Sequence, residues 1–370
     1  MILYNDPHRH NQYYQQEIKK AVNDVLNSSH YILAHHVNCF ETEFAQYLQV
    51  KHSIGVASGT DALHLSLLAL DIGCRDEVIV PSHTAVATVA AIKLVGATPV
   101  FVDIDKTFCT LNPKQIHHAI TKQTKAIIVV HLYGSPADMQ ALLNIAQQYQ
   151  LELIEDCAQA TGARYQGQAI GSLGTLGCFS FYPTKTLGGI GDGGAISCNN
   201  TELANRIRSL RQYGWDSQHI SHEIGLNSRL DELQAAILRV KLRHLDSDNQ
   251  IRIQLAQNYT QAFTDLPIEV IQVQEGANPV YHLYVIIVQQ RAALIEHLKK
   301  ANIIAGIHYP IPVHKMPAYT TSLCHHSLSI TEKMATQVLS LPLYVGLSHT
   351  EQTKVINSVR DFFSSFKPLK

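Results

Sequence analysis

Charged side chains are scarce in this sequence, and their charges nearly cancel. Asp, Glu, Lys and Arg make up 16% of the 370 residues, and the formal net charge is -1. Typical soluble domains contain about 25% charged residues. Without a positive field to attract nucleic acid or an anionic membrane, a nucleic-acid-binding protein is not expected. Because 46% of the residues are hydrophobic, the chain can bury a large core.

The sequence also lacks a C-x-x-C pair and any long uninterrupted hydrophobic run. Its seven cysteines are scattered and odd in number, which is typical of reduced thiols in a cytoplasmic protein. The N-terminus turns polar after four residues, unlike a secretory signal. The longest apolar region, residues 85–102, contains Lys93, Gly96 and Pro99, which favours a helix, a turn and a strand. We therefore expect a cytoplasmic protein that does not bind a membrane.

The 21 histidines show no recognisable metal-binding pattern. Several are close in sequence, such as His35 and His36, but none lies in an H-E-x-x-H motif or beside a cysteine pair. We expect loop and surface histidines and no bound metal.

Seven short β-rich runs dominate the first 200 residues, and the early ones alternate with helical patterns. The runs begin at Ser53, Glu77, Pro99, Ala126, Leu151, Cys178 and Gly193. Nearly continuous apolar strands separated by helices favour a mainly parallel sheet covered on both faces. We predict an α/β fold with a mainly parallel seven-stranded sheet between helices. Such sheets bind ligands at the carboxyl ends of their strands.

A long amphipathic helical pattern over residues 228–250 is expected to carry the chain out of this large domain. The remainder mixes helices with the strand-like YHLYVIIVQ and the segment HYPIPVH at residues 308–314. We predict a large domain over residues 1–249 and a smaller C-terminal α+β domain over residues 250–370.

A possible phosphate site follows the first predicted strand, in the segment SGTDALHL. Gly59 permits close backbone approach, Thr60 offers a hydroxyl, and the start of the following helix presents free amides. An ordinary Thr or Asp helix cap would explain the same residues.

The segment LELIEDCAQATGA places Asp156 at the end of an apolar strand and Gln159 three residues later. A carboxylate there can hold a proton on a heteroaromatic nitrogen, and the amide can meet a neighbouring oxygen. Taken alone, the pattern is explained better by a strand-end acid that caps a turn.

The segment CFSFYPTKTLGGIGDGGAI places Lys185 among apolar residues and glycines. A lysine at a strand end can become a Schiff-base nucleophile if its surroundings lower its pKa. Residues 189–194 also match G-x-G-x-x-G, but a strand-like AISCNN follows where the dinucleotide fingerprint requires a helix. We therefore reject a nicotinamide site.

Seven motifs occur in one order along the chain: SGTDALHL, PSHTAVAT, VHLYGSPADM, EDCAQATGA, SFYPTKTLGGIGDGGAI, LRQYGW and GLNSRLDELQAAIL. From about residue 30 to the end, the sequence resembles the DegT/DnrJ/EryC1/StrS family of pyridoxal-phosphate-dependent sugar aminotransferases. The resemblance implies aminotransferase fold type I. It also implies that Lys185 joins the cofactor covalently as a Schiff base and serves as general acid and base. Asp156 would pair with the pyridinium nitrogen, and Gln159 would contact the ring hydroxyl oxygen.

The resemblance further implies a homodimer with shared active sites. The residues around the cofactor phosphate would be Gly59, Thr60, Ser180 and, from the partner subunit, Asn227. In many relatives an aromatic residue stacks on the cofactor ring, but here Ala85 follows Thr84. Stacking would then come from elsewhere, with His83 as a weak candidate, or be replaced by aliphatic packing.

The substrates implied are glutamate, as amino donor, and a nucleotide-linked keto-deoxysugar. The motifs look more like the branch that aminates C3 of a dTDP-linked 3-keto-6-deoxyhexose. Amination at C4 stays open, as do a cyclitol ketone acceptor and a non-catalytic regulator on the same scaffold. His308, Tyr309 and His314 are candidates to face the sugar or the donor, and a structural role for their loop is equally consistent. His83 is a further candidate for contact with substrate.

Overall fold

The computed structural model of the protein describes residues 1–324 and 326–365. All seven expected strands form, and they lie in one sheet. Their order and bounds are β1 (His52–Val56), β9 (Gly194–Cys198), β8 (Leu176–Ser180), β5 (Glu152–Asp156), β4 (Thr124–Val130), β2 (Glu77–Pro81) and β3 (Thr98–Val102). β9 runs opposite to the other strands and is antiparallel to both β1 and β8, while the remaining pairs are parallel, so the mainly parallel sheet is confirmed. The two-residue strand β13 (Leu323–Cys324) was not predicted from the sequence, and it extends the sheet beyond β3.

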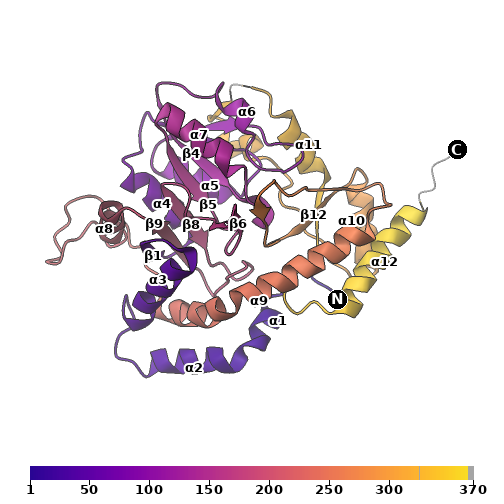
Figure 1. The fold of residues 1–370 in the computed structure, drawn as a ribbon, viewed down its shortest axis with the longest axis horizontal. Helices are drawn as coiled ribbons and strands as arrows, with labels where there is room; N and C mark the ends of the chain where they lie inside the picture. The colour runs from indigo at the N-terminus through magenta and orange to yellow at the C-terminus, as the bar shows by residue number, and fades with distance from the viewer. Residues whose placement is uncertain (325, 366–370) are drawn as a thin grey trace.

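Helices cover both faces of this sheet (Figure 1). On one face lie α3 (His35–Leu48), α7 (Met139–Tyr149) and the first half of α9 (Glu232–Ala262), and on the other α4 (Gly59–Ala69), α5 (Val86–Leu94) and α8 (Thr201–Leu210). Successive residues of β4 alternate between the two cores: Ile127 and Val129 pack in the first, Ala126 and Ile128 in the second. Because both faces are covered, the strands are apolar almost throughout, which explains their sequence pattern.

Helix α9 is one continuous helix of 31 residues that runs from the sheet into the C-terminal part of the chain (Figure 1). A third apolar core surrounds its second half. The elements of the C-terminal part are β10 (Glu269–Val270), β12 (Tyr284–Ile287), α10 (Arg291–Lys300), α11 (Ser329–Gln337), β14 (Val338–Leu341) and α12 (His349–Ser365). The expected domain division after residue 249 falls inside α9 and stays a prediction.

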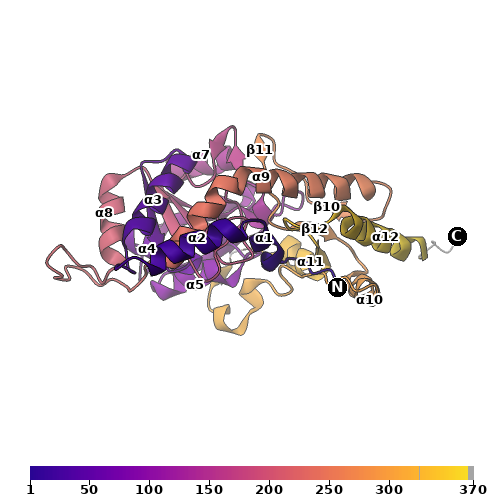
Figure 2. The ribbon, with the colours of Figure 1, turned by 90° about the horizontal axis from the view of Figure 1, so that it is seen from below.

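The N-terminal residues pack with this C-terminal part as well as with α9. Ile2 lies in the third core, and its backbone bonds to Asn302 and Ile304 at 2.8 Å. Helices α1 (Pro7–Tyr13) and α2 (Gln15–Leu26) follow, and α2 lies along α9 (Figure 2). The remaining short elements are α6 (Pro113–Ile116), β6 (Arg164–Tyr165), β7 (Gln168–Ala169), β11 (Ala277–Asn278) and the 3-10 helices η1 (Leu132–Gly134), η2 (Val313–Lys315) and η3 (Pro317–Tyr319).

Candidate active site

Parallel neighbouring strands bring the predicted carboxylate and the predicted lysine to one edge of the sheet. Asp156 is the last residue of β5, and Ser180 is the last residue of the adjacent strand β8. Lys185 follows in a turn in which its backbone N–H donates to the carbonyl of Tyr182 (2.9 Å). Asp156 and Lys185 are close enough for each to shift the pKa of the other.

The Asp156 carboxylate is buried, with 5% of the residue exposed. Oδ1 accepts the backbone N–H of Ala158 (3.1 Å), and Oδ2 accepts the hydroxyl of Thr88 (2.8 Å). Burial raises the pKa of Asp156, while these two hydrogen bonds and the nearby Lys185 lower it. A carboxylate has about four acceptor positions, so Asp156 retains capacity for another donor.

Lys185 has the electrostatic environment of a reactive amine. Burial lowers the pKa of its ammonium group to about 8, and the opposing effect of Asp156 is smaller. A neutral amine is the nucleophilic form, so a substantial share of Lys185 can react near neutral pH.

The glycine-rich turn after Lys185 is held from two sides. Gly189 N–H donates to the carbonyl of Phe181 (2.8 Å), which folds the turn back on β8. From α9, the buried Lys241 donates through Nζ to the carbonyl of Gly188 (2.6 Å), and Gln234 accepts the N–H of Ile190 (2.9 Å). The turn that carries Lys185 is therefore anchored to the sheet and to α9.

Gln159 lies beside Tyr309, which comes from the predicted substrate loop. Its Oε1 accepts the backbone N–H of Tyr133 (2.6 Å), and its Nε2 donates to the Tyr309 hydroxyl (3.1 Å). Since the amide oxygen is engaged by an N–H, the amide nitrogen must face Tyr309. Gln159 therefore offers a donor, as contact with a ring oxygen would require.

His83 and His308 meet through Tyr133. The Tyr133 hydroxyl donates to the carbonyl of His308, so the 2.8 Å contact between His83 Nε2 and this hydroxyl requires the proton on Nε2. His83 is 1% exposed, and burial lowers its pKa to about 4. Burial, with Lys185 adding to the effect, likewise lowers the pKa of His308 to about 4. One ring nitrogen of His83 is thus bonded to Tyr133. Stacking of His83 on the cofactor ring stays a prediction.

His314 has a different setting from His308 and Tyr309. Its Nδ1 lies 2.7 Å from Ser82 Oγ, and its Nε2 lies 3.2 Å from Glu332. These contacts connect the end of β2 to α11. They favour the structural interpretation of this part of the loop, and its predicted contact with substrate stays a prediction.

The predicted phosphate residues lie together at the start of α4. A Cβ added to Gly59 would lie 2.6 Å from Ser180 Cβ, so only glycine allows α4 to approach β8 this closely. Ser58, and not a Thr or Asp, caps the helix by accepting the N–H of Asp61 (3.1 Å). The Thr60 hydroxyl makes no hydrogen bond to any residue that the structure describes, which keeps it available to a ligand.

A long loop follows α8 and projects beyond it (Figure 1). Asn227 of this loop is exposed and forms an isolated bridge with Gln212. The next residue, Ser228, accepts the N–H of Ala57 (3.1 Å) and donates to Asp61 (2.7 Å), so the base of the loop is tied to the start of α4. The loop also exposes Ile224, at 94%. The predicted contact of Asn227 with a partner subunit stays a prediction.

One group of possible metal ligands occurs in residues 1–324 and 326–365: His131, Glu155 and Cys157, whose ligand atoms lie within 4.8 Å of one another. His131 Nδ1 accepts the N–H of Ala137 (3.2 Å), so Nε2 carries the proton and donates to Glu155 (3.2 Å). Glu155 also accepts three backbone N–H groups, from residues 171, 173 and 174. We interpret this group as a buried hydrogen-bond network, since both nitrogens of His131 are engaged.

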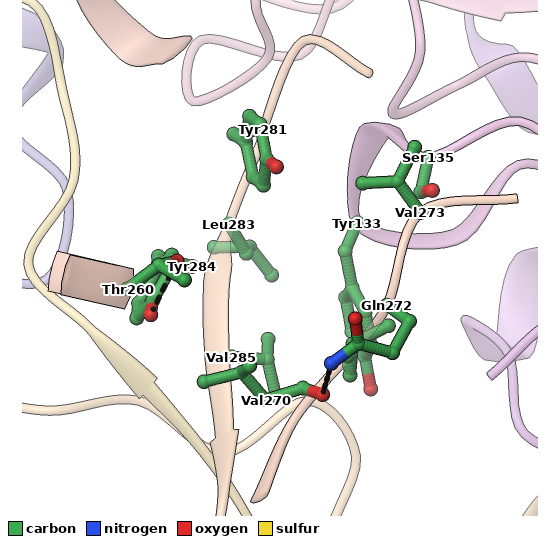
Figure 3. A pocket seen from close by; sticks show the side chains of 11 residues that line it. Tyr133, Ser135, Thr260, Val270, Gln272, Val273, Tyr281, Leu283, Tyr284 and Val285 are labelled. Carbon is green, nitrogen blue, oxygen red and sulfur yellow. Dashed lines mark hydrogen bonds between the residues drawn. The ribbon is translucent and has the colours of Figure 1, made fainter. Parts of the chain in front are cut away.

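A separate cavity of about 260 Å³ lies between β12 and residues 270–273 (Figure 3). Tyr133 lines it through its ring, and the wall opposite includes Leu283 and Val285. None of the site residues predicted from the sequence lines this cavity. Its lining holds no titratable acid or base other than tyrosine, so it lacks the groups that amino transfer needs.

Three residues around the site were missed by the sequence analysis. Thr88 lies four residues after Thr84, a spacing that can place two hydroxyls on one side of a helix start. Lys241 lies on the buried side of an amphipathic helix, and a lysine at such a position could have been recognised as a buried cation from the helical pattern. Tyr133 belongs to one of the quoted motifs, but nothing in its spacing indicates a contact with Gln159.

The fold and this arrangement of residues define an aminotransferase of fold type I. The chain belongs to the DegT/DnrJ/EryC1/StrS aminotransferase family, whose model matches residues 12–360.

Individual relatives match over almost the whole chain. The dTDP-3-amino-3,6-dideoxy-alpha-D-galactopyranose transaminase of Aneurinibacillus thermoaerophilus is 46% identical over 362 residues, which are 98% of this chain and 99% of the relative. The crystal structure of Streptomyces venezuelae DesV in complex with a ketimine intermediate has a TM-score of 0.95 and 44% identity, and covers 98% of each chain. The crystal structure of NtdA from Bacillus subtilis with bound cofactor PMP has a TM-score of 0.89 and 32% identity, over 95% of this chain and 82% of NtdA.

Within the described part of the chain, no helix has both the length and the apolar character needed to cross a membrane.

Proposed function

We propose that this protein uses pyridoxal phosphate to move an amino group from glutamate to C3 of a dTDP-linked 3-keto-6-deoxyhexose. The observation that carries the proposal is the pair at the sheet edge, Lys185 with its lowered pKa beside the buried carboxylate of Asp156. The cofactor is further supported by NtdA, a structural relative with bound PMP. The sugar and its carrier are supported by the Aneurinibacillus relative, a dTDP-3-amino-3,6-dideoxyhexose transaminase.

The residues present fit the cofactor. Asp156 has spare acceptor capacity for a protonated ring nitrogen, and the amide nitrogen of Gln159 can donate to a ring oxygen. Gly59 brings the start of α4 against Ser180, where backbone N–H groups can receive a phosphate. Bound pyridoxal phosphate supplies an electron sink for the bonding electrons of the donor's α-carbon.

The chain's own residues bind, orient and move protons. The neutral amine of Lys185 would anchor the cofactor covalently and would serve as the base for the donor's α-carbon proton. The negative charge of Asp156 would hold the ring nitrogen of the cofactor and favour a proton on it. His308 and Tyr309 border this region from the C-terminal part, so we assign them to contact with the sugar or donor.

The proposal includes a cytoplasmic homodimer in which Asn227 reaches the phosphate of the partner subunit's cofactor. The exposure of Asn227 and the projecting loop with the exposed Ile224 support this arrangement. A twofold dimer is the commonest form of soluble oligomer.

The direct test follows the absorbance of the protein-bound cofactor. Holoenzyme is first aminated with glutamate, freed of donor, and then mixed with a 3-keto or a 4-keto dTDP-6-deoxyhexose. Recovery of the original spectrum with the 3-keto sugar alone supports the proposal. Recovery with the 4-keto sugar alone moves the amination to C4, and recovery with neither indicates another acceptor, such as a cyclitol ketone.

A regulator without turnover would show no amino transfer in the wild type, and the role of Lys185 in turnover is tested by Lys185→Ala. We expect this variant to lose amino transfer by about 10²-fold to 10⁴-fold, the usual contribution of a general acid and base. Lys122→Ala, which removes an exposed lysine, serves as the matched control and should keep full activity. Full amino transfer by Lys185→Ala would disprove the assignment of Lys185.

A further inference from the structure

Two buried threonines connect to the carboxylate that we assign to the ring nitrogen. Thr84 Oγ1 lies 2.9 Å from Thr88 Oγ1, and Thr88 Oγ1 lies 2.8 Å from Asp156 Oδ2. Thr84 is 1% exposed and Thr88 is fully buried. Thr84 directly precedes Ala85, the position at which many relatives place the aromatic residue that stacks on the cofactor, and Thr88 follows Ala85 by three residues.

The chemistry of the groups fixes the direction of these two hydrogen bonds. An ionised carboxylate only accepts, so the single proton of the Thr88 hydroxyl is donated to Asp156. Thr88 can then only accept from Thr84, whose hydroxyl must be the donor in the first contact. Hydroxyls that donate in series polarise one another, so Thr84 strengthens the bond that Thr88 makes to Asp156.

We propose that Thr84 and Thr88 are positioning residues that hold Asp156 ionised and oriented toward the ring nitrogen of the cofactor. The inference rests on the proposed role of Asp156 and adds how the protein maintains that role. Thr88 is in the first turn of α5, where its N–H donates to the carbonyl of Ala85 (3.2 Å). This hydrogen bond holds in place the backbone from which the Thr88 side chain extends. Thr88 and the Ala158 N–H are the two donors that oppose the effect of burial on this carboxylate.

Other groups also act on Asp156 and must be kept constant in a test. The titratable groups that interact electrostatically with Asp156 are Lys185, His131, Cys157, Cys178 and Tyr309. Substitutions confined to the two threonines leave all of these groups in place.

The experiment uses Thr88→Val, which removes the hydroxyl and keeps the β-branched shape. Without its donor, Asp156 is protonated more easily and holds the ring nitrogen less firmly. We expect the dissociation constant for pyridoxal phosphate, measured on the apo protein, to rise about tenfold, the low end for a hydrogen bond to a charged group. The acid limb of the kcat profile should move up by about one pH unit.

Three further variants separate positioning from structure. Thr84→Val should shift both readouts in the same direction but less, and Thr88→Ser, which retains a hydroxyl, should restore them. Thr331→Val is the matched control, because Thr331 is equally buried and its hydroxyl has no hydrogen-bond partner among the described residues. It should leave the affinity for the cofactor and the pH profile unchanged.

The proposal is overturned if Thr88→Val binds the cofactor as the wild type does and keeps its acid limb while Asp156→Asn is impaired. If Asp156→Asn also retains wild-type affinity, the role of Asp156 in the proposed function fails instead. A shift of equal size in Thr331→Val would likewise overturn the proposal. Should Thr88→Val not fold, Thr84→Val decides, and the absence of any shift in that variant counts against the inference.

Discussion

At Lys185, burial and a neighbouring carboxylate act on one amine in opposite directions. Burial disfavours the charged ammonium and lowers its pKa, while the negative charge of Asp156 raises it. Burial has the larger effect, and the resulting pKa of about 8 lies close to the pH at which a base is most useful. A lysine on the surface would stay protonated and would not attack a carbonyl.

We therefore predict that Lys185 in the apo protein reacts with cyanate with a midpoint near pH 8. The rate should rise about tenfold between pH 7 and pH 9, because the neutral fraction of the amine rises by that factor. Peptide mass spectrometry after timed exposure measures the rate at this residue. In Asp156→Asn the midpoint should fall, since the charge that favours the ammonium is gone. A midpoint near 10.4, the value of a solvated lysine, would contradict the assignment.

At the scale of elements, the start of α3 is stabilised by a residue far away in sequence. Ala34 stands at the N-cap of α3 and has no side chain with which to cap it. Glu232, the first residue of α9, instead accepts the N–H groups of Ala34, His36 and Val37 at 2.8 to 2.9 Å. Only 2% of Glu232 is exposed, so the loss of its carboxylate would leave one buried donor, the N–H of Val37, and two partly buried donors without a partner.

Glu232→Ala is therefore expected to lower the free energy of unfolding by about 3 kcal/mol, because a buried donor left unpaired costs about 1 to 3 kcal/mol and the two partly buried donors add to that cost. Urea unfolding followed by circular dichroism measures the change. The matched control is Glu269→Ala, whose exposed carboxylate lies 3.5 Å from Lys106. An exposed ion pair contributes about 0 to 1 kcal/mol, so the control should change little. Equal effects in both variants would disprove the capping role.

At the scale of the whole molecule, the site is assembled from two parts of the chain. Asp156 comes from the end of a sheet strand and Lys185 from the turn after the neighbouring strand, while His308 and Tyr309 come from the C-terminal part. The long helix α9 joins the two parts and also anchors the turn of Lys185 through Lys241. The proposed dimer would add a further residue, Asn227, from outside the chain.

Coexpression of two inactive variants tests whether the site is shared. In a mixed dimer of Lys185→Ala with Asn227→Ala, a shared site leaves one of the two active sites with both residues intact. We therefore predict that the mixed dimer regains activity that neither homodimer shows, measured as amino transfer by affinity-purified heterodimer.

If Asn227 instead serves the site of its own subunit, each site of the mixed dimer carries one defect. Activity no higher than that of the two homodimers would then contradict the shared site. A monomer by light scattering would contradict the dimer itself.

Much of the fold could be predicted because its signal is local. The seven strands are short apolar runs bounded by turn residues, and their bounds agree with the structure to within a few residues. Asp156 and Ser180 could be placed at strand ends for the same reason. β13 could not be predicted, since two residues carry no periodicity. α9 continues beyond the domain boundary predicted after residue 249, because its helical pattern has no break there.

The sequence by itself determined the sheet, the family and the residues most suited to chemistry, because strand periodicity and the motifs depend only on residues that are close together in sequence. Only the tertiary structure decided which side chains support them. Thr88 contacts Asp156 across 68 residues, and Tyr133 contacts Gln159 across 26. The same loop delivers Tyr309 to Gln159 but turns His314 toward Ser82 and Glu332. Such contacts depend on how whole elements pack, and local sequence does not encode that packing.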